Sequence, residues 1–319
     1  WEVPEPDHPW SNIGYWGDQQ IAYLLALLEA SDNHQPGEIR RLLNARLFSF
    51  ADVPYRIAPY ASLVRDPKAT IGFDVVAHER SLQRATEVGG DGRLLWSNGD
   101  VFLTTLAEKL ILPALAKMAN FVAGGGIWMN TQRPEWNDAN NALVGNGLSM
   151  VTLYQLRGYL HHLRELGLDD DRYELSAEVA EWLSATSTAL LADVIMKGSD
   201  GGDARRRQLM DSLGMPFSEY RTTIAATGFT ERVSIAWSDI RQFCDRALTH
   251  IDATIADAQR PDGLYHSYNV LRLYDEGGVN AAAIEHLPEM LEGQVAVMSS
   301  GVLSPNESAD LVDRMFDSR

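Results

Sequence analysis

The sequence predicts an all-α protein of the α/α toroid type, in which paired helices form a ring and the loops at one end build a cleft. Two observations support this prediction. Apolar residues recur at helical spacing along most of the chain, and the connections between these stretches concentrate tryptophan and tyrosine. Because an exposed aromatic ring forfeits about 1.5–3 kcal/mol of burial, such loops indicate a surface that covers or uses the rings.

The first predicted helix runs from about 18 to 30, because apolar residues from Ile21 to Leu28 follow an i, i+3, i+4, i+7 pattern. Ser176 and Ser304 are placed to cap two later helices. The remaining predicted helices span residues 38–48, 74–87, 100–123, 147–167, 176–197, 203–213, 236–258, 280–300 and 305–316.

No repeat or low-complexity stretch divides the chain, so a single domain over residues 1–319 is predicted. The glycine-rich stretch 197–203 is either a hinge or a surface loop. A chain that begins at Trp1 is expected to be a processed product or a part of a longer polypeptide.

Charge and composition exclude several classes of partner. With 27 basic and 44 acidic residues the net charge is -17, which repels nucleic acid and anionic membrane surfaces. No apolar run approaches the roughly 20 residues of a membrane span, so a soluble protein is expected, with the cytoplasm as the favoured compartment.

Cofactor and metal motifs are absent from the sequence. Cys244 is the one cysteine, which excludes an internal disulfide and a cysteine-rich zinc site. His161 and His162 are adjacent on a helix and face different directions, so they do not suit one metal ion. No nucleotide-binding or serine hydrolase motif occurs, and we therefore expect no metal and no organic cofactor.

The stretch TQRPEWNDANNALVG, residues 131–145, holds the strongest candidate chemistry. Gly124–Gly126 ends a helix, residues 127–129 suit a short extended segment, and Pro134 keeps the following acids in a loop. A carboxylic acid beside a tryptophan can protonate a glycosidic oxygen, while amides bind sugar hydroxyls. The alternative is that these Asn and Asp side chains bond the backbone of turns.

The segment MNTQRPEWNDANNALVGNGLSMVTLYQLRGYL resembles the active-site segment of the cellobiose phosphorylase family of glycoside phosphorylases, which has the motif D-W-N-D-G-M-N. WSNIGYWGDQQIAYLLALLE and LEGQVAVMSSG are similar to an earlier and a later segment of that family. The resemblance implies an (α/α)6 barrel of the six-hairpin glycosidase type, complete or lacking part of its ring. It also implies that Asp138 is the general acid and that the reaction inverts the anomeric centre.

This sequence departs from the family at several positions. A sugar-binding aspartate of the family falls near Asn12 or Ile13, so that carboxylate contact is lost or moved. Glu135 replaces an aspartate, and Leu148 replaces a glutamate. The family's phosphate site lies partly on loops beyond its late helix, so phosphate dependence does not carry over. Inorganic phosphate remains an optional co-substrate.

Glu292 is the predicted partner of Asp138, because it begins the late helix that returns toward the predicted cleft. The alternative is a solvated helix acid. Glu289, Asp18 and Glu135 are weaker candidates for the same role.

The residues predicted to contact substrate share amide, aromatic or charged side chains in the loops. Arg133 alternatively braces its loop, and the aromatic residues near Trp16 alternatively form a hydrophobic plug. Tyr265, His266 and Tyr268 stand where the family has W-Y-R-R-A-Y. The full set is Asn12, Trp16, Asp18, Arg133, Glu135, Trp136, Asn137, Asn141, Tyr265 and His266.

The predicted function is cleavage of a glycosidic bond in a glucan or related oligosaccharide, by hydrolysis or phosphorolysis. The alternative is a noncatalytic glycan-binding or scaffolding domain. A catalytic protein places a second carboxylate across the cleft from Asp138, whereas a binding domain needs amides and aromatic rings alone.

Overall fold

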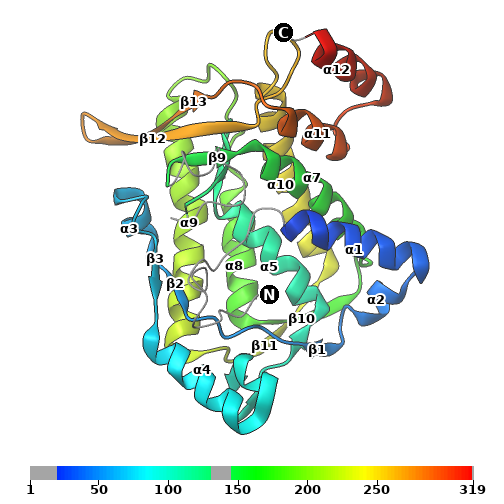
Figure 1. The fold of residues 1–319 in the computed structure, drawn as a ribbon, viewed down its shortest axis with the longest axis vertical. Helices are drawn as coiled ribbons and strands as arrows, with labels where there is room; N and C mark the ends of the chain where they lie inside the picture. Colours follow the sequence, from blue (N-terminus) through cyan, green and yellow to red (C-terminus); the bar gives the residue numbers. More distant parts are fainter. Residues whose placement is uncertain (1–19, 131–144, 318–319) are drawn as a thin grey trace.

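The computed structural model describes residues 20–130 and 145–317 and shows a mixed α/β fold, so the prediction of an all-α toroid is wrong. Of the described residues, 55% are helical and 19% are in strands, and the largest sheet that they form is a curled, five-stranded antiparallel one. In Figure 1 this sheet lies across the upper ends of the long helices, and a two-stranded sheet covers their lower ends.

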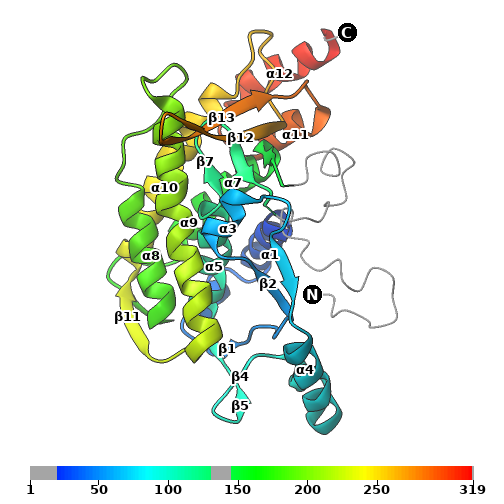
Figure 2. The ribbon, with the colours of Figure 1, turned by 90° about the vertical axis from the view of Figure 1, so that its left-hand side faces the viewer.

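The helices are α1 (Gln20–His34), α2 (Glu38–Leu42), α3 (Tyr60–Arg65), α4 (Val75–Val88), α5 (Leu106–Met118), α7 (Met150–Glu165), α8 (Ala177–Ala189), α9 (Gly202–Thr227), α10 (Trp237–Asp257), α11 (Leu291–Ser299) and α12 (Pro305–Asp317), with a 3-10 turn η1 (Gly89–Arg93). In Figure 2, α8, α9 and α10 lie on one side of the molecule, and α1, α3 and α4 lie on the other. No helix within the described ranges combines the length and apolar character needed to cross a membrane.

The strands are β1 (Arg46–Phe48), β2 (Tyr55–Ile57), β3 (Ile71–Phe73), β4 (Trp96–Ser97), β5 (Asp100–Val101), β6 (Thr104–Thr105), β7 (Phe121–Val122), β8 (Gly126–Trp128), β9 (Gly147–Ser149), β10 (Arg172–Ser176), β11 (Arg232–Ala236), β12 (Tyr268–Glu276) and β13 (Val279–His286). The five-stranded sheet has the order β13-β12-β9-β8-β7, and the other sheets have two strands each.

The sequence located most helices but not the strands beside them. The helices predicted at 74–87, 236–258 and 305–316 are confirmed as α4, α10 and α12 to within a few residues. The stretches predicted as single helices at 100–123, 147–167 and 280–300 each contain at least one strand as well as a helix. Strands of two or three residues carry too little period-2 pattern to stand out from an adjoining helix. The eight-residue strand β13 was missed because its alanine-rich sequence VNAAAIEH suits a helix.

Two of the predicted local features are confirmed. Residues 127 and 128 belong to β8, as the predicted extended segment requires. Ser304 caps α12, where its hydroxyl accepts from the Glu307 N–H at 3.3 Å and its own N–H donates to the Glu307 carboxylate at 2.8 Å. Ser176 precedes α8 as predicted, but its hydroxyl does not cap the helix.

Helix α7 is the centre of the main hydrophobic core, and none of its residues before Glu165 is exposed. It packs against α1, α5, α10 and α11. Ser149 caps it by accepting the Thr152 N–H at 3.0 Å, and the Met150 N–H donates to the Ser267 carbonyl at 2.9 Å. The strand β9 therefore leads directly into a helix that is fixed at its first turn.

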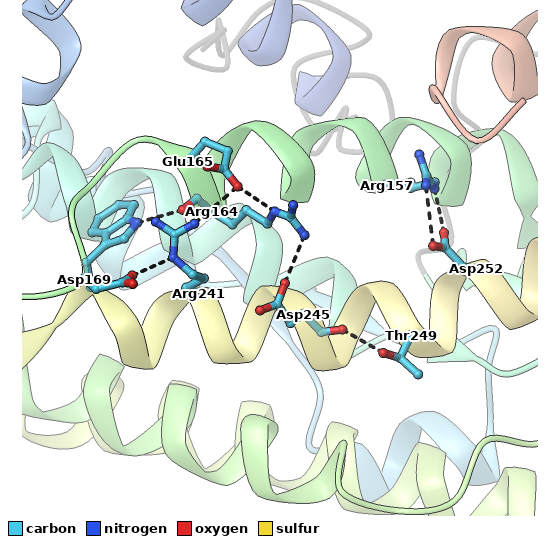
Figure 3. Close-up of polar contacts among 9 residues, drawn as sticks. Arg157, Arg164, Glu165, Asp169, Arg241, Asp245, Thr249 and Asp252 are labelled. Atoms are coloured by element: carbon cyan, nitrogen blue, oxygen red, sulfur yellow. Dashed lines mark hydrogen bonds and ion pairs between the residues drawn. The ribbon is translucent and has the colours of Figure 1, made fainter. Parts of the chain in front are cut away.

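Ion pairs line the contact between α7 and α10, as Figure 3 shows. Arg164 bonds Asp245 at 3.1 Å, and Arg241 bonds Asp169 at 2.6 Å, at positions that water reaches. Such exposed pairs contribute little to stability. Arg157 differs because its guanidinium is nearly buried, where it bonds Asp252 at 2.6 Å and the Ser300 carbonyl at 2.9 Å.

The five-stranded sheet encloses a second hydrophobic cluster, in which Trp128, Leu148 and Leu271 meet Met210 of α9. The sheet curls so far that one side chain bridges its two edge strands. Arg206 of α9 donates to the Ala282 carbonyl in β13 at 2.5 Å and to the Ala123 carbonyl, directly after β7, at 2.7 Å. Both carbonyls belong to buried residues at the edges of the described sheet. The guanidinium therefore supplies the hydrogen-bond donors that a neighbouring strand would otherwise provide.

A fully buried carboxylate joins α5 to the lower sheet. Glu108 accepts the Thr104 hydroxyl at 2.7 Å and the Ser176 hydroxyl at 3.2 Å, and the Ser176 N–H also donates to it. Its own N–H donates to the Thr105 hydroxyl at 3.2 Å, which caps the helix. The bonds offset the cost of burying the charge.

We expect Glu108→Ala to lower the free energy of unfolding by about 3 kcal/mol, because buried donors on Thr104 and Ser176 lose their acceptor. Urea denaturation measures the change. Glu181→Ala, at an exposed position of α8, is the control and should change stability by less than about 0.5 kcal/mol. Equal effects of the two substitutions would contradict the role of Glu108.

Arg206→Met is expected to lower the free energy of unfolding by about 2–3 kcal/mol, because it leaves the carbonyls of Ala123 and Ala282 without their donor. The neighbouring substitution Arg205→Met is a matched control, since Arg205 forms a long ion pair with Asp193, at 4.0 Å. A stability loss that is the same for both variants would show that the bridge between edge strands is unimportant.

Candidate functional site

Three of the residues predicted to form the site lie in the described part of the chain, namely Tyr265, His266 and Glu292. The structure brings them to one corner of the molecule, where the segment between α10 and β12 meets the first turn of α11. The other predicted residues fall outside the described ranges: Asn12, Trp16, Asp18, Arg133, Glu135, Trp136, Asn137, Asp138 and Asn141.

The sheet relates this corner to the strands on either side of residues 131–144. That segment connects β8 to β9 along the chain, and Ser149 of β9 pairs with Ile127 of β8 on one side and with Tyr268 of β12 on the other. Trp128, the last residue of β8, donates its indole N–H to the Gly145 carbonyl at 2.8 Å, which ties the end of β8 to the residues just before β9. Tyr268 is thus one strand away from the strand that follows the E-W-N-D motif.

Glu292 lies in the first turn of α11 and is half-buried. The Tyr268 hydroxyl donates to its carboxylate at 2.8 Å, and Tyr268 itself is buried in the sheet. An acid in the first turn also interacts favourably with the helix dipole. The carboxylate is therefore held in a defined position at the surface of the core.

Ser267 fixes the turn that carries Glu292. Its hydroxyl accepts the Gly293 N–H at 2.9 Å and donates to the Met290 carbonyl at 3.0 Å. A Cβ on Gly293 would lie 2.3 Å from that hydroxyl oxygen, so glycine permits this close approach of helix and strand.

Gln294 joins the same turn to Tyr265. Its amide accepts the Tyr265 N–H at 2.8 Å and donates to the Tyr265 carbonyl at 2.7 Å. The Tyr265 ring is buried and packs edge-on against Tyr154, with ring centroids 6.5 Å apart. Burial, followed by the charge of Glu307, raises the pKa of the Tyr265 phenol. These contacts give Tyr265 a packing role.

The His266 ring stacks on His286, with centroids 4.1 Å apart and planes 7° apart. Burial, followed by His286 and Arg260, lowers the pKa of His266 to about 4. His286 shares a 2.8 Å hydrogen bond with Asn269, whose amide donates to the Gly125 carbonyl at 2.8 Å. The neutral form of His266 is consequently favoured near pH 7.

Gln294, Asn269 and His286 were not predicted as site residues. The alternating pattern of residues 268–276, followed by Gly277-Gly278, was the available signal for the hairpin that pairs Asn269 with His286. Glu289, the weaker acid candidate, is exposed and pairs with Arg260 at 3.0 Å. Its position is that of a surface ion pair.

Over residues 20–130 and 145–317, no group of three or more His, Cys, Asp or Glu side chains is arranged to hold a metal ion. A comparison of the chain with protein-family models and with curated proteins found no match.

Tyr268→Phe is expected to lower the free energy of unfolding by about 1 kcal/mol, because the ring is kept and one charge-assisted hydrogen bond to Glu292 is lost. Tyr23→Phe, on the exposed face of α1, provides the control. Both are measured by chemical denaturation, and an unchanged Tyr268→Phe variant would mean that the hydroxyl does not stabilise the turn.

Proposed function

We propose that this chain is a carbohydrate-active enzyme that cleaves a glycosidic bond in a glucan or related oligosaccharide, acting in the cytoplasm. Asp138 is the proposed general acid, and Glu292 is the proposed second carboxylate. The observation that supports this proposal is the position of Glu292, which Tyr268 holds one strand away from β9, into which the E-W-N-D segment leads.

The two carboxyl groups would divide the chemistry between them. In hydrolysis, Asp138 gives its proton to the glycosidic oxygen, and Glu292 takes a proton from the attacking water. Inversion follows when that water attacks from the face opposite the leaving group. In phosphorolysis, inorganic phosphate attacks instead, and a general base is not required.

The proposed substrate contacts come from both parts of the chain. Trp16 and Trp136 would stack on sugar rings, and Asn137 and Asn141 would bind hydroxyl groups. His266 would support this site by its position next to Ser267, since its Nδ1 atom is enclosed and its ring bonds the Leu287 backbone.

The test is release of reducing sugar and sugar phosphate from a panel of α- and β-linked gluco-oligosaccharides, with and without inorganic phosphate. Asp138→Asn should lower the rate about 100- to 10,000-fold in either reaction, because it removes the proton donor. Glu292→Gln should do the same in hydrolysis but should leave phosphorolysis largely intact.

Glu289→Gln is the matched control, because Glu289 precedes the same helix and pairs with Arg260 at the surface. It should retain the wild-type rate. Absence of any release from the wild-type chain, together with measurable oligosaccharide binding, would contradict the enzyme and support a noncatalytic glycan-binding domain.

A further inference from the structure

The stacked imidazoles of His266 and His286 occupy a junction between four elements. His266 lies on the segment that leads from α10 into β12, and its N–H donates to the Ala258 carbonyl at 3.1 Å. His286 is the last residue of β13 and pairs with Asn269 of β12. The stack therefore joins the base of the β12–β13 hairpin to the end of α10 and the approach to α11.

The hydrogen bonds around His286 show which ring nitrogen carries the hydrogen when this imidazole is neutral. Because the Asn269 amide nitrogen donates to the Gly125 carbonyl, its oxygen faces His286. The Nδ1 atom of His286 therefore carries the hydrogen that this oxygen accepts. A second proton on His286 would go to the other ring nitrogen.

A second proton on His266 would have no acceptor. Its Nδ1 atom is enclosed and makes no hydrogen bond within residues 20–130 and 145–317. A hydrogen bond with the Leu287 backbone favours the charged form, but burial and the neighbouring charges outweigh it. Protonation would thus place an unsatisfied N–H in an enclosed position.

The charged groups that face the stack come from three elements and are mainly positive. Arg260 follows α10, Lys197 lies in the loop after α8, and Arg206 belongs to α9. The neighbouring acids bond other groups: Asp203 pairs with Arg206, Asp262 and Glu289 pair with Arg260, and Asp257 accepts the Lys197 N–H. These ion pairs partly neutralise Arg206 and Arg260, so the main repulsion on double protonation is between the two imidazoles, whose centroids lie 4.1 Å apart.

We propose that His266 and His286 form an acid-operated latch, which holds the hairpin base against the 264–268 segment at neutral pH and releases it on acidification. The latch acts on the turn that carries Glu292, because the residue after His266, Ser267, is bonded to that turn. Ser267 accepts the Met150 N–H of the first turn of α7 and the Gly293 N–H of the first turn of α11. The latch follows from contacts among the described residues and does not depend on the proposed function.

The direction of the effect follows from linkage. Both imidazoles have a lowered pKa in the folded chain, so the closed state binds fewer protons than the open state. The latch is at full strength above the ordinary histidine pKa of about 6.5. It weakens as pH falls from there toward the folded pKa of His266, about 4.

Amide hydrogen exchange on the whole chain tests the latch, with protection factors corrected for the intrinsic pH dependence of exchange. The probes are the amides of Met150, His266 and Gly293. Between about pH 6.5 and about pH 5, their protection should fall about tenfold per pH unit if one proton opens the latch, and up to about 100-fold if two do.

The double variant His266→Phe, His286→Phe keeps two stacked rings and removes both protons. We expect its protection to be nearly independent of pH, while the control His34→Gln, at an exposed position of α1, behaves like wild type. The same loss of protection in wild type and double variant would overturn the latch, as would constant protection in wild type.

An NMR titration of the histidines in the wild-type chain measures the folded pKa of His266 directly and requires no variant. A folded pKa of His266 well below about 6.5 is the expected result. A pKa at or above that value would overturn the proposal, because the closed state would then be favoured by protonation.

Discussion

The rest of the structure depends on the packing of α7, of which no residue before Glu165 is exposed. Because of this burial, its polar side chains must find most of their partners within the protein, and three of them bond different neighbours. The Tyr159 hydroxyl donates to the Leu110 carbonyl of α5 at 2.6 Å, and the Tyr154 hydroxyl donates to the His266 carbonyl at 3.0 Å. Arg157 reaches both α10 and the end of α11. The polar groups of one helix therefore determine where its neighbours sit.

The strands show why helical periodicity alone led to a toroid. Leu148 stands three residues before Val151 and continues the apolar spacing of α7, so sequence reasoning joined β9 to the helix. The strand conformation there is set by pairing with Ile127 and Tyr268, which are distant along the chain. By contrast, the β12–β13 hairpin had a local signal: Leu271 and Leu273 flank an exposed Arg272, and Gly277 and Gly278 have positive φ angles of 63° and 89°. The pairing of β9 with distant strands could not be predicted from the sequence, whereas the local signal of the β12–β13 hairpin was sufficient to predict it.

The candidate site was partly predictable for a related reason. Glu292 and the Tyr265–Tyr268 segment stood out because their residue types suit sugar chemistry, and the fold places them in contact. Gln294 and Asn269 have no such chemical distinction. Their importance comes from bonding main-chain groups of Tyr265 and Gly125, and those partners are defined by the tertiary fold. The sequence therefore indicates the chemically reactive groups better than it indicates the groups that hold them in position.

The contacts of residues 266–268 also explain how a change at the two histidines can reach the Glu292 carboxylate, which lies on a different element. Ser267 uses its carbonyl for the N–H of Met150 and its hydroxyl for both Gly293 and Met290, so it cannot move without disturbing two helix starts. His266 precedes it directly and is held from the other side by Ala258 and Tyr154. Tyr268 follows it and bonds Glu292. Three consecutive residues therefore carry the titrating ring, the main-chain junction and the donor to the acid. A segment this short couples its neighbours because its three residues together bond α7, α11 and the end of α10.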